Sequence, residues 1–164
     1  MIMRLNNRNK ANFYQFLATA VFMLVIGGIF LFLLEKLNYN FLGSTEYLLL
    51  IIPLFLLLIF YIRGRQIFEY DSDGEALNFK NRNVILFLNK ALNDEFPKYK
   101  LLKYEIVNLK IIKKLYITIS SKKSTSIILK YDISYLTRKE INDLKFSLTK
   151  TIKKNMDNKS EINS

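Results

Sequence analysis

Two long runs of apolar residues near the start of the chain set its organisation. Residues 13–34 carry no charge, and a helix of that length rises roughly 33 Å, enough to cross the apolar core of a bilayer. Residues 47–62 form a second, shorter uncharged run, with the uncharged residues 41–45 shortly before it and Arg63, which can snorkel, directly after it. The pattern predicts a transmembrane helical hairpin over residues 13–63, with spans at about 13–34 and 44–63.

The charges that flank the two runs predict which way the hairpin faces. Basic residues stand before the first run and after the second, whereas the connection between the runs has a slight acidic excess. Both chain ends are therefore expected on the cytoplasmic side. The flanking basic residues are the candidate membrane-interface residues: Arg4, Arg8, Lys10, Arg63 and Arg65. A cleaved signal peptide is disfavoured because no small-residue cleavage pattern follows residue 34, and a pair of buried core helices because so short a chain could not cover them.

From residue 66 the pattern changes to an alternation with a period of two. Residues 66–81 alternate on either side of the turn-forming sequence Asp-Ser-Asp-Gly, which predicts a β-hairpin. Residues 91–96 are expected to be a connection, and Pro97 is typical of an edge or of a strand start. Further strands are expected at residues 84–88, 101–109, 115–121 and 125–131. The pattern thus predicts six strands in an antiparallel meander.

The end of the chain has a helical period. Thr137 and Glu140 have the spacing of a capping box, in which each side chain accepts the other residue's backbone N–H. Apolar residues then recur at intervals of three and four: Ile141, Leu144, Leu148 and Ile152. This stripe predicts an amphipathic helix to about residue 154. Residues 66–155 are expected to form one cytoplasmic domain, preceded by a basic lead at 1–12 and followed by a disordered tail at 156–164.

Composition narrows the chemistry that the chain can perform. The 164 residues carry a formal net charge of +11 and include no cysteine and no histidine. Disulfides, thiolate nucleophiles, Cys/His metal sites and Ser-His-Asp triads are therefore impossible within this chain. The acidic residues around the first turn lack the spacing of a calcium loop and are expected to be solvated: Glu69, Asp71, Asp73 and Glu75. A non-enzymatic protein is expected, without cofactor, metal, small-molecule substrate or nucleic-acid partner.

Two further groups of residues are candidate contact sites. Gly27 and Gly28 in the first span lie at the same depth as Pro53 in the second, which favours close packing of the two helices there. The alternatives are that these residues are merely tolerated or that they face a partner protein. Five lysines around one strand pair form either a basic patch for lipid or an acidic partner, or a dispersed solvated face: Lys110, Lys113, Lys114, Lys122 and Lys123.

The order of these segments resembles the bacterial pleckstrin-homology-like (PH-like) membrane proteins. The resemblance is carried by residues 67–81, 95–106, 113–121 and 133–141. It covers about residues 66–155 together with the preceding hairpin, and it implies an antiparallel β-barrel or sandwich of six to seven strands, closed by a C-terminal amphipathic helix. Because the pattern gives six strands where the family has seven, either residues 91–100 contain another strand or the barrel is partly open.

The resemblance implies a binding or scaffolding module of the bacterial inner membrane, without catalytic residues to carry over. The leading hypothesis is a small accessory subunit that contacts membrane lipids and a larger membrane protein or a second copy of itself. The alternative is an autonomous lipid-headgroup-binding module, which is disfavoured because the acidic turn at residues 71–75 stands where relatives collect basic residues. A pore or transporter is disfavoured because neither span carries an ionisable residue.

Overall fold

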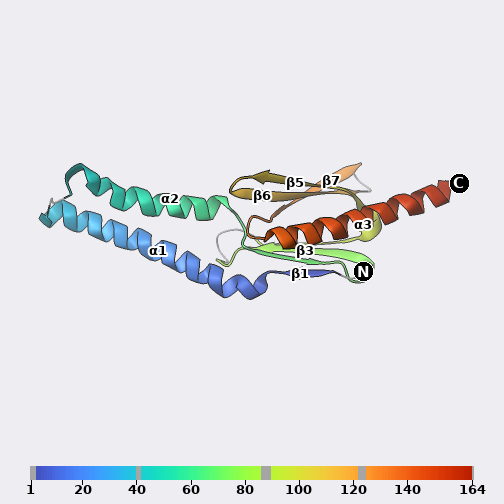
Figure 1. Ribbon diagram of the computed structural model, residues 1–164, viewed down its shortest axis with the longest axis horizontal. Helices are drawn as coiled ribbons and strands as arrows, with labels where there is room; N and C mark the ends of the chain where they lie inside the picture. The colour runs from blue at the N-terminus through green and yellow to red at the C-terminus, as the bar shows by residue number, and fades with distance from the viewer. Residues whose placement is uncertain (1–2, 40–41, 86–89, 122–124, 164) are drawn as a thin grey trace.

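A computed structural model describes residues 3–39, 42–85, 90–121 and 125–163 (Figure 1). Two helices, α1 (Ala11–Leu34) and α2 (Leu48–Ile62), run side by side as a hairpin that projects from one end of a β domain. The β domain consists of two antiparallel sheets and a long C-terminal helix, α3 (Arg138–Asn163). The described residues therefore confirm an apolar hairpin followed by a sheet domain with a C-terminal helix.

The hairpin consists of two helical stretches long and apolar enough to cross a membrane, Arg8–Leu37 and Gly43–Ile62. In each, only 17% of the most apolar window is buried within the chain, so most of its side chains face the surroundings. The connection is closed by polar contacts, because the Leu42 N–H donates to the Glu35 carboxylate and the Lys36 ammonium lies 3.1 Å from Glu46.

The β domain has more strands than the alternation predicts. The first sheet has the order β1 (Arg4–Asn6), β2 (Ile67–Asp71), β3 (Ala76–Arg82) and β4 (Leu92–Pro97). The second has the order β5 (Leu101–Leu109), β6 (Ile112–Ser120) and β7 (Ser126–Asp132). All paired neighbours are antiparallel. The chain therefore passes back and forth between a proximal end, where the hairpin joins, and a distal end, where both termini lie (Figure 1).

Two strands correct the sequence-based predictions. The basic lead at residues 1–12 was expected to lie outside the domain, but Arg4–Asn6 forms β1 and its Leu5 is buried in the core. Residues 91–96 were expected to be a connection, but Leu92–Pro97 forms the edge strand β4, in which the polar Asp94 takes an inward-facing position and so breaks the apolar–polar alternation. The strand expected at residues 84–88 is not formed at Val84 and Ile85, which lie in a bend, and its remainder lies outside the described residues.

The core lies between the two sheets and α3. Phe79 stacks on Phe96 and on Tyr131, with ring centroids 5.6 and 4.9 Å apart. Burial raises the pKa of Tyr131, and its hydroxyl donates to Asp94 at 2.9 Å, which raises that pKa further. The apolar stripe of α3 covers the core, with Leu144 and Leu148 fully buried.

Helix α3 begins as the sequence predicts and ends later. The Thr137 N–H donates to Glu140 Oε2 at 2.7 Å, and the Glu140 N–H donates to Thr137 Oγ1 at 3.2 Å, which confirms the capping box. The tail at 156–164 was expected to be disordered, but α3 continues to Asn163, so this prediction is wrong for residues 156–163. Polar residues fill this last part because the helix runs past the sheets (Figure 1), and no glycine or proline interrupts it.

Candidate functional site

The first candidate site is the junction between the hairpin and the β domain, which centres on the buried carboxylate of Asp132. Arg65 donates to Asp132 Oδ2 from its backbone N–H at 3.1 Å and from Nη1 at 3.3 Å, and the Lys114 ammonium pairs with Oδ1. Gly64 has a φ of +77°, and a Cβ there would lie 2.6 Å from the same carboxylate. Only glycine therefore allows the chain to leave α2 and turn into the sheet at this point.

Arg63 and Tyr14 hold the segment that leads from β7 into α3. The Arg63 guanidinium lies 4.3 Å from the centroid of the Tyr135 ring, and its Nη2 donates to the Ser134 carbonyl at 3.2 Å. The Tyr14 hydroxyl of α1 donates to the Tyr135 carbonyl at 3.3 Å, and the two rings pack edge to face. Both helices of the hairpin thus contact the same short segment of the β domain.

Asn7 and Lys10 complete the junction from the N-terminal side. The fully buried Asn7 side chain donates to the Gln66 carbonyl and accepts the Phe68 N–H, each at 2.8 Å. The Lys10 ammonium lies 3.1 Å from Glu140. Burial alone raises the pKa of Glu140, but the Thr137 N–H and hydroxyl and the Lys10 ammonium outweigh burial and hold that pKa below its usual value. The hairpin is therefore fixed to the β domain by hydrogen bonds and ion pairs on several sides.

The five basic residues predicted at the membrane interface do not lie together. Lys10, Arg63 and Arg65 are at the junction, where each side chain makes at least one polar contact within the chain. Arg8 is exposed beside them. Arg4 lies instead toward the distal end of β2, where it pairs with Asp71 at 3.0 Å and with Asp73 at 2.9 Å. Arg4 therefore neutralises part of the acidic turn rather than joining the junction.

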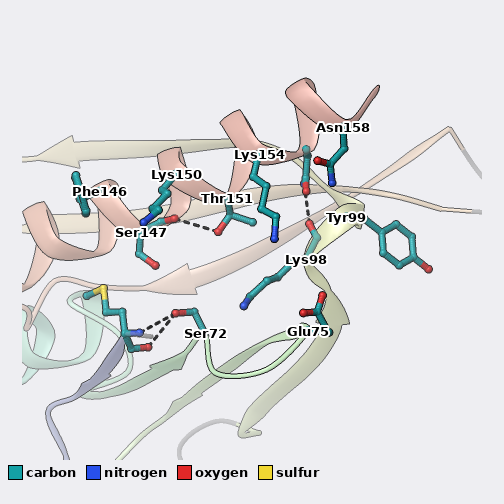
Figure 2. Close-up of a pocket in the computed structure, with 12 residues that line it drawn as sticks. Ser72, Glu75, Lys98, Tyr99, Phe146, Ser147, Lys150, Thr151, Lys154 and Asn158 are labelled. Carbon is teal, nitrogen blue, oxygen red and sulfur yellow. Dashed lines mark hydrogen bonds between the residues drawn. The ribbon is translucent and has the colours of Figure 1, made fainter. Parts of the chain in front are cut away.

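The second candidate site is a distal groove of about 290 Å³ between α3 and the turns that follow β2 and β4 (Figure 2). Figure 2 shows the side chains of Lys154 and Lys98 reaching into the space between the helix and the turn at residues 72–75. The other lining residues mix apolar and polar side chains, and they are Met3, Ser72, Glu75, Tyr99, Phe146, Ser147, Lys150, Thr151, Asn155 and Asn158.

Hydrogen bonds connect the segments that form the walls of the distal groove. Ser72 Oγ accepts the Met3 N–H at 3.0 Å, and Asn155 Nδ2 donates to the Lys98 carbonyl at 2.8 Å and to the Leu101 carbonyl at 3.1 Å. The Lys98 ammonium donates to the Gly74 carbonyl. The ammonium groups of Lys150 and Lys154 have no ion-pair partner in the part of the chain that the structure describes. The groove thus offers positive charge beside apolar surface.

The helix-packing residues lie at a close contact between α1 and α2. A Cβ on Gly28 would overlap the Leu49 carbonyl oxygen and would lie 3.1 Å from Cγ of Pro53. A Cβ on Gly27 would meet no atom within 4 Å. Gly28 therefore approaches the carbonyl that Pro53 leaves without its helical donor, whereas Gly27 faces away from α2.

The described lysines of the predicted basic patch differ in their surroundings. Lys110 is exposed in the turn between β5 and β6, Lys113 is half-buried, and Lys114 is committed to Asp132 at the junction. Lys122 and Lys123 lie outside the described residues. From Lys113 to its end at Ser120, strand β6 runs roughly 23 Å toward the distal end, at about 3.3 Å per residue. The described lysines of this group therefore belong to the proximal end alone.

The main residues of the two sites carry no local signal in the sequence. Asp132 is an isolated acid in an alternating strand, and Asn7 lies in a polar lead, so neither carries a local signal.

A scan against protein-family models matched no family, and searches of curated proteins and of solved structures found no match. The assignment of function therefore depends on the arrangement of the chain itself.

Proposed function

We propose that this protein is a membrane-anchored scaffolding module, whose hairpin crosses the bacterial inner membrane and whose β domain binds a larger membrane protein on the cytoplasmic side. The observation that carries the proposal is the junction, where Asp132, Asn7 and Tyr14 join the hairpin to the β domain by contacts on several sides. A rigid junction suits a protein that holds a binding surface at a fixed position relative to a bilayer.

The apolar exterior of the hairpin supports membrane insertion. Large side chains such as Phe16, Ile26 and Phe55 are more than half exposed, and they continue along both helices. Soluble proteins rarely expose contiguous apolar patches larger than a few hundred Å², whereas a bilayer core accepts such a surface. Basic residues at the hairpin's open end and the acidic excess at its closed end favour cytoplasmic termini.

The arrangement of the β domain supports the PH-like interpretation. Four strands and three strands in two antiparallel sheets, followed by a long helix packed on the core, agree with the architecture that the resemblance implies. In this chain the first strand comes before the membrane hairpin, so that β1 and β2 pair across the inserted helices. This insertion is a further reason for the rigid junction, because the hairpin enters and leaves between two paired strands.

The distal groove is the proposed binding surface for the partner. Strand β5 leads from the groove to the proximal turn over nine residues, which is roughly 25 to 30 Å at about 3.3 Å per residue. At that distance the lysines of the groove do not reach the headgroups of the bilayer that holds the hairpin. Their charge, next to Met3 and Phe146, suits an acidic and partly apolar protein segment.

The test is purification of the full-length protein from its native membrane in mild detergent, followed by identification of what accompanies it. We expect one larger membrane protein in stoichiometric amount. The double variant Lys150→Glu/Lys154→Glu should lose this partner, because it reverses the charge of the groove. The matched control is Lys145→Glu/Lys153→Glu, which makes the same charge change on exposed residues of α3 outside the groove and should keep the partner.

The alternative, an autonomous lipid-headgroup-binding module, predicts a different result. A full-length protein that elutes alone as a monomer, and that binds liposomes of one anionic headgroup beyond what charge alone explains, would contradict the scaffolding proposal. Charge-driven binding alone would fade as salt screens it and would not favour one headgroup over another of equal charge.

A further inference from the structure

The turn between β5 and β6 carries apolar side chains where a turn normally carries polar ones. Leu109 pairs with Ile112, so that Lys110 and Ile111 form a two-residue turn, and Lys110 has a φ of +25°. Two-residue turns of this kind favour asparagine, aspartate and glycine. Here Leu109 is 63% exposed and Ile111 is 52% exposed. The turn therefore presents two large apolar side chains that the β domain itself does not cover.

This turn lies against the end of α2. Leu109, Ile111 and Ile112 line a shallow apolar hollow together with Ile59 and Ile62, the last residue of α2. The apolar surface of the hairpin thus continues without a break onto the tip of the second sheet. In Figure 1 the tip of β5 and β6 and the end of α2 meet at the proximal end.

The length of the second apolar stretch sets the depth of this tip. Gly43–Ile62 contains 20 residues, which rise about 30 Å as a helix, and the apolar core of a bilayer is about 30 Å thick. With the stretch centred in the bilayer, Ile62 lies at the inner edge of the core. Leu109 and Ile111 share the hollow with Ile59 and Ile62, so they lie at the same depth, where apolar and charged side chains meet the lipid headgroups.

We propose that the β5–β6 turn is a second membrane contact, in which Leu109 and Ile111 insert into the inner leaflet and Lys110 meets the headgroup phosphates. The inference rests on the proposed membrane-spanning hairpin and extends it to the β domain. Lipid is the occupant because the hollow continues the lipid-facing surface of α2, and because the exposed Lys110 complements anionic headgroups. The contact fixes the tilt of the β domain, so that the distal groove faces away from the bilayer.

The absence of native cysteine allows a direct test by depth-dependent quenching. Single variants of the full-length protein, each labelled with the fluorophore NBD, are reconstituted into vesicles of phosphatidylcholine and phosphatidylglycerol. The variants are Ile111→Cys at the tip, Tyr99→Cys at the distal end and Ile26→Cys within α1, all at exposed positions. Nitroxide groups on the lipid chains quench the probe from position 5, near the headgroups, or from position 12, near the bilayer centre.

We expect the probe at Ile111 to emit at shorter wavelength than the probe at Tyr99 and to be quenched several-fold more strongly, more by position 5 than by position 12. The probe at Ile26 should show the opposite depth preference. If Ile26 is quenched and Ile111 is not, the hairpin spans the membrane and the second contact is wrong. If Ile26 is not quenched either, both proposals fail. A short-wavelength but unquenched probe at Ile111 would mean that a second copy covers the tip, which also overturns the lipid contact.

Discussion

The hairpin and the β domain use apolar residues in opposite ways. In the β domain, side chains such as Leu77, Phe79 and Leu115 are fully buried between the sheets and α3. In the hairpin, side chains such as Phe16 and Ile26 point outward, and only a small part of each helix is covered by the other. The β domain therefore closes its own core, whereas the hairpin leaves its apolar surface exposed, as the proposed membrane span requires. A substitution should affect folding in the first region and membrane contact in the second.

The contact between the hairpin and the β domain depends largely on polar side chains. It uses hydrogen bonds and ion pairs around Asp132, Asn7 and Glu140, beside the shallow apolar contact between the end of α2 and the β5–β6 turn. Such contacts require defined directions, since a buried polar group that loses its partner costs about 1 to 3 kcal/mol. The junction therefore specifies one orientation of the hairpin relative to the sheets.

The largest effect is expected where a charge enters the core of the β domain. Leu144→Asp should destabilise the full-length protein by several kcal/mol, because Leu144 is fully buried on the face of α3 that covers the core. Phe146→Asp is the matched control, since Phe146 is an exposed residue of the same helix. Thermal unfolding followed by circular dichroism in detergent should separate the two variants. Equal melting temperatures would show that α3 does not pack on the sheets as described.

The next effect is expected at the junction. Asp132→Asn should cost about 3 kcal/mol, because it leaves Arg65 and Lys114 without the carboxylate that both contact. It should also broaden the distribution of distances between spin labels at Ile26→Cys in α1 and Tyr99→Cys in the β domain, measured by double electron–electron resonance. Asp143→Asn, an exposed acid on α3, should change neither property. An unchanged distance distribution in Asp132→Asn would mean that this carboxylate does not hold the hairpin in place.

Within the hairpin, two adjacent glycines provide a matched pair. Gly28→Ala should weaken the hairpin by about 1 to 3 kcal/mol, because its Cβ would overlap the Leu49 carbonyl oxygen and crowd Pro53. Gly27→Ala should be neutral or slightly stabilising, because a Cβ there meets no atom within 4 Å and alanine favours a helix over glycine. The stability of both variants is measured by unfolding in mixed micelles with a rising fraction of dodecyl sulfate. An equal response of the two variants would contradict the close contact at Gly28.

The smallest effect is expected from the cap of α3 and depends on pH. The pKa of Glu140 is lower in the folded protein than its usual value. The ionised carboxylate therefore stabilises the fold at pH values above the usual pKa. This contribution is lost as the pH falls through the lowered pKa. Glu140→Gln should therefore cost about 1 kcal/mol at pH 7. The difference from the parent should shrink at pH values below the lowered pKa. The control Glu105→Gln, at an exposed position of β5, should show no such pH-dependent difference. A loss of stability in Glu140→Gln that does not change with pH would contradict the ion pair between Glu140 and Lys10.

Local patterns could predict the elements that local forces specify. The uncharged runs gave the two helices, and the Thr137 to Glu140 spacing gave the start of α3, because each signal lies within a few residues. Strand β1 could not be predicted, since its three residues pair with β2 across the whole hairpin. The same reason applies to Asp132, whose partners Arg65 and Lys114 come from two other parts of the chain. The distal groove joins four separate segments of the chain, so it has no contiguous motif.

The central claim is that the hairpin crosses the membrane and that the β domain lies on the cytoplasmic side. Single cysteines test it directly in intact cells with a membrane-impermeant maleimide, because the chain has no cysteine of its own. We expect Ser44→Cys, in the exposed connection of the hairpin, to be labelled in intact cells, and Asn158→Cys, in exposed α3, to be labelled only after the membrane is permeabilised. The reverse pattern, or recovery of the protein in the soluble fraction, would contradict the account.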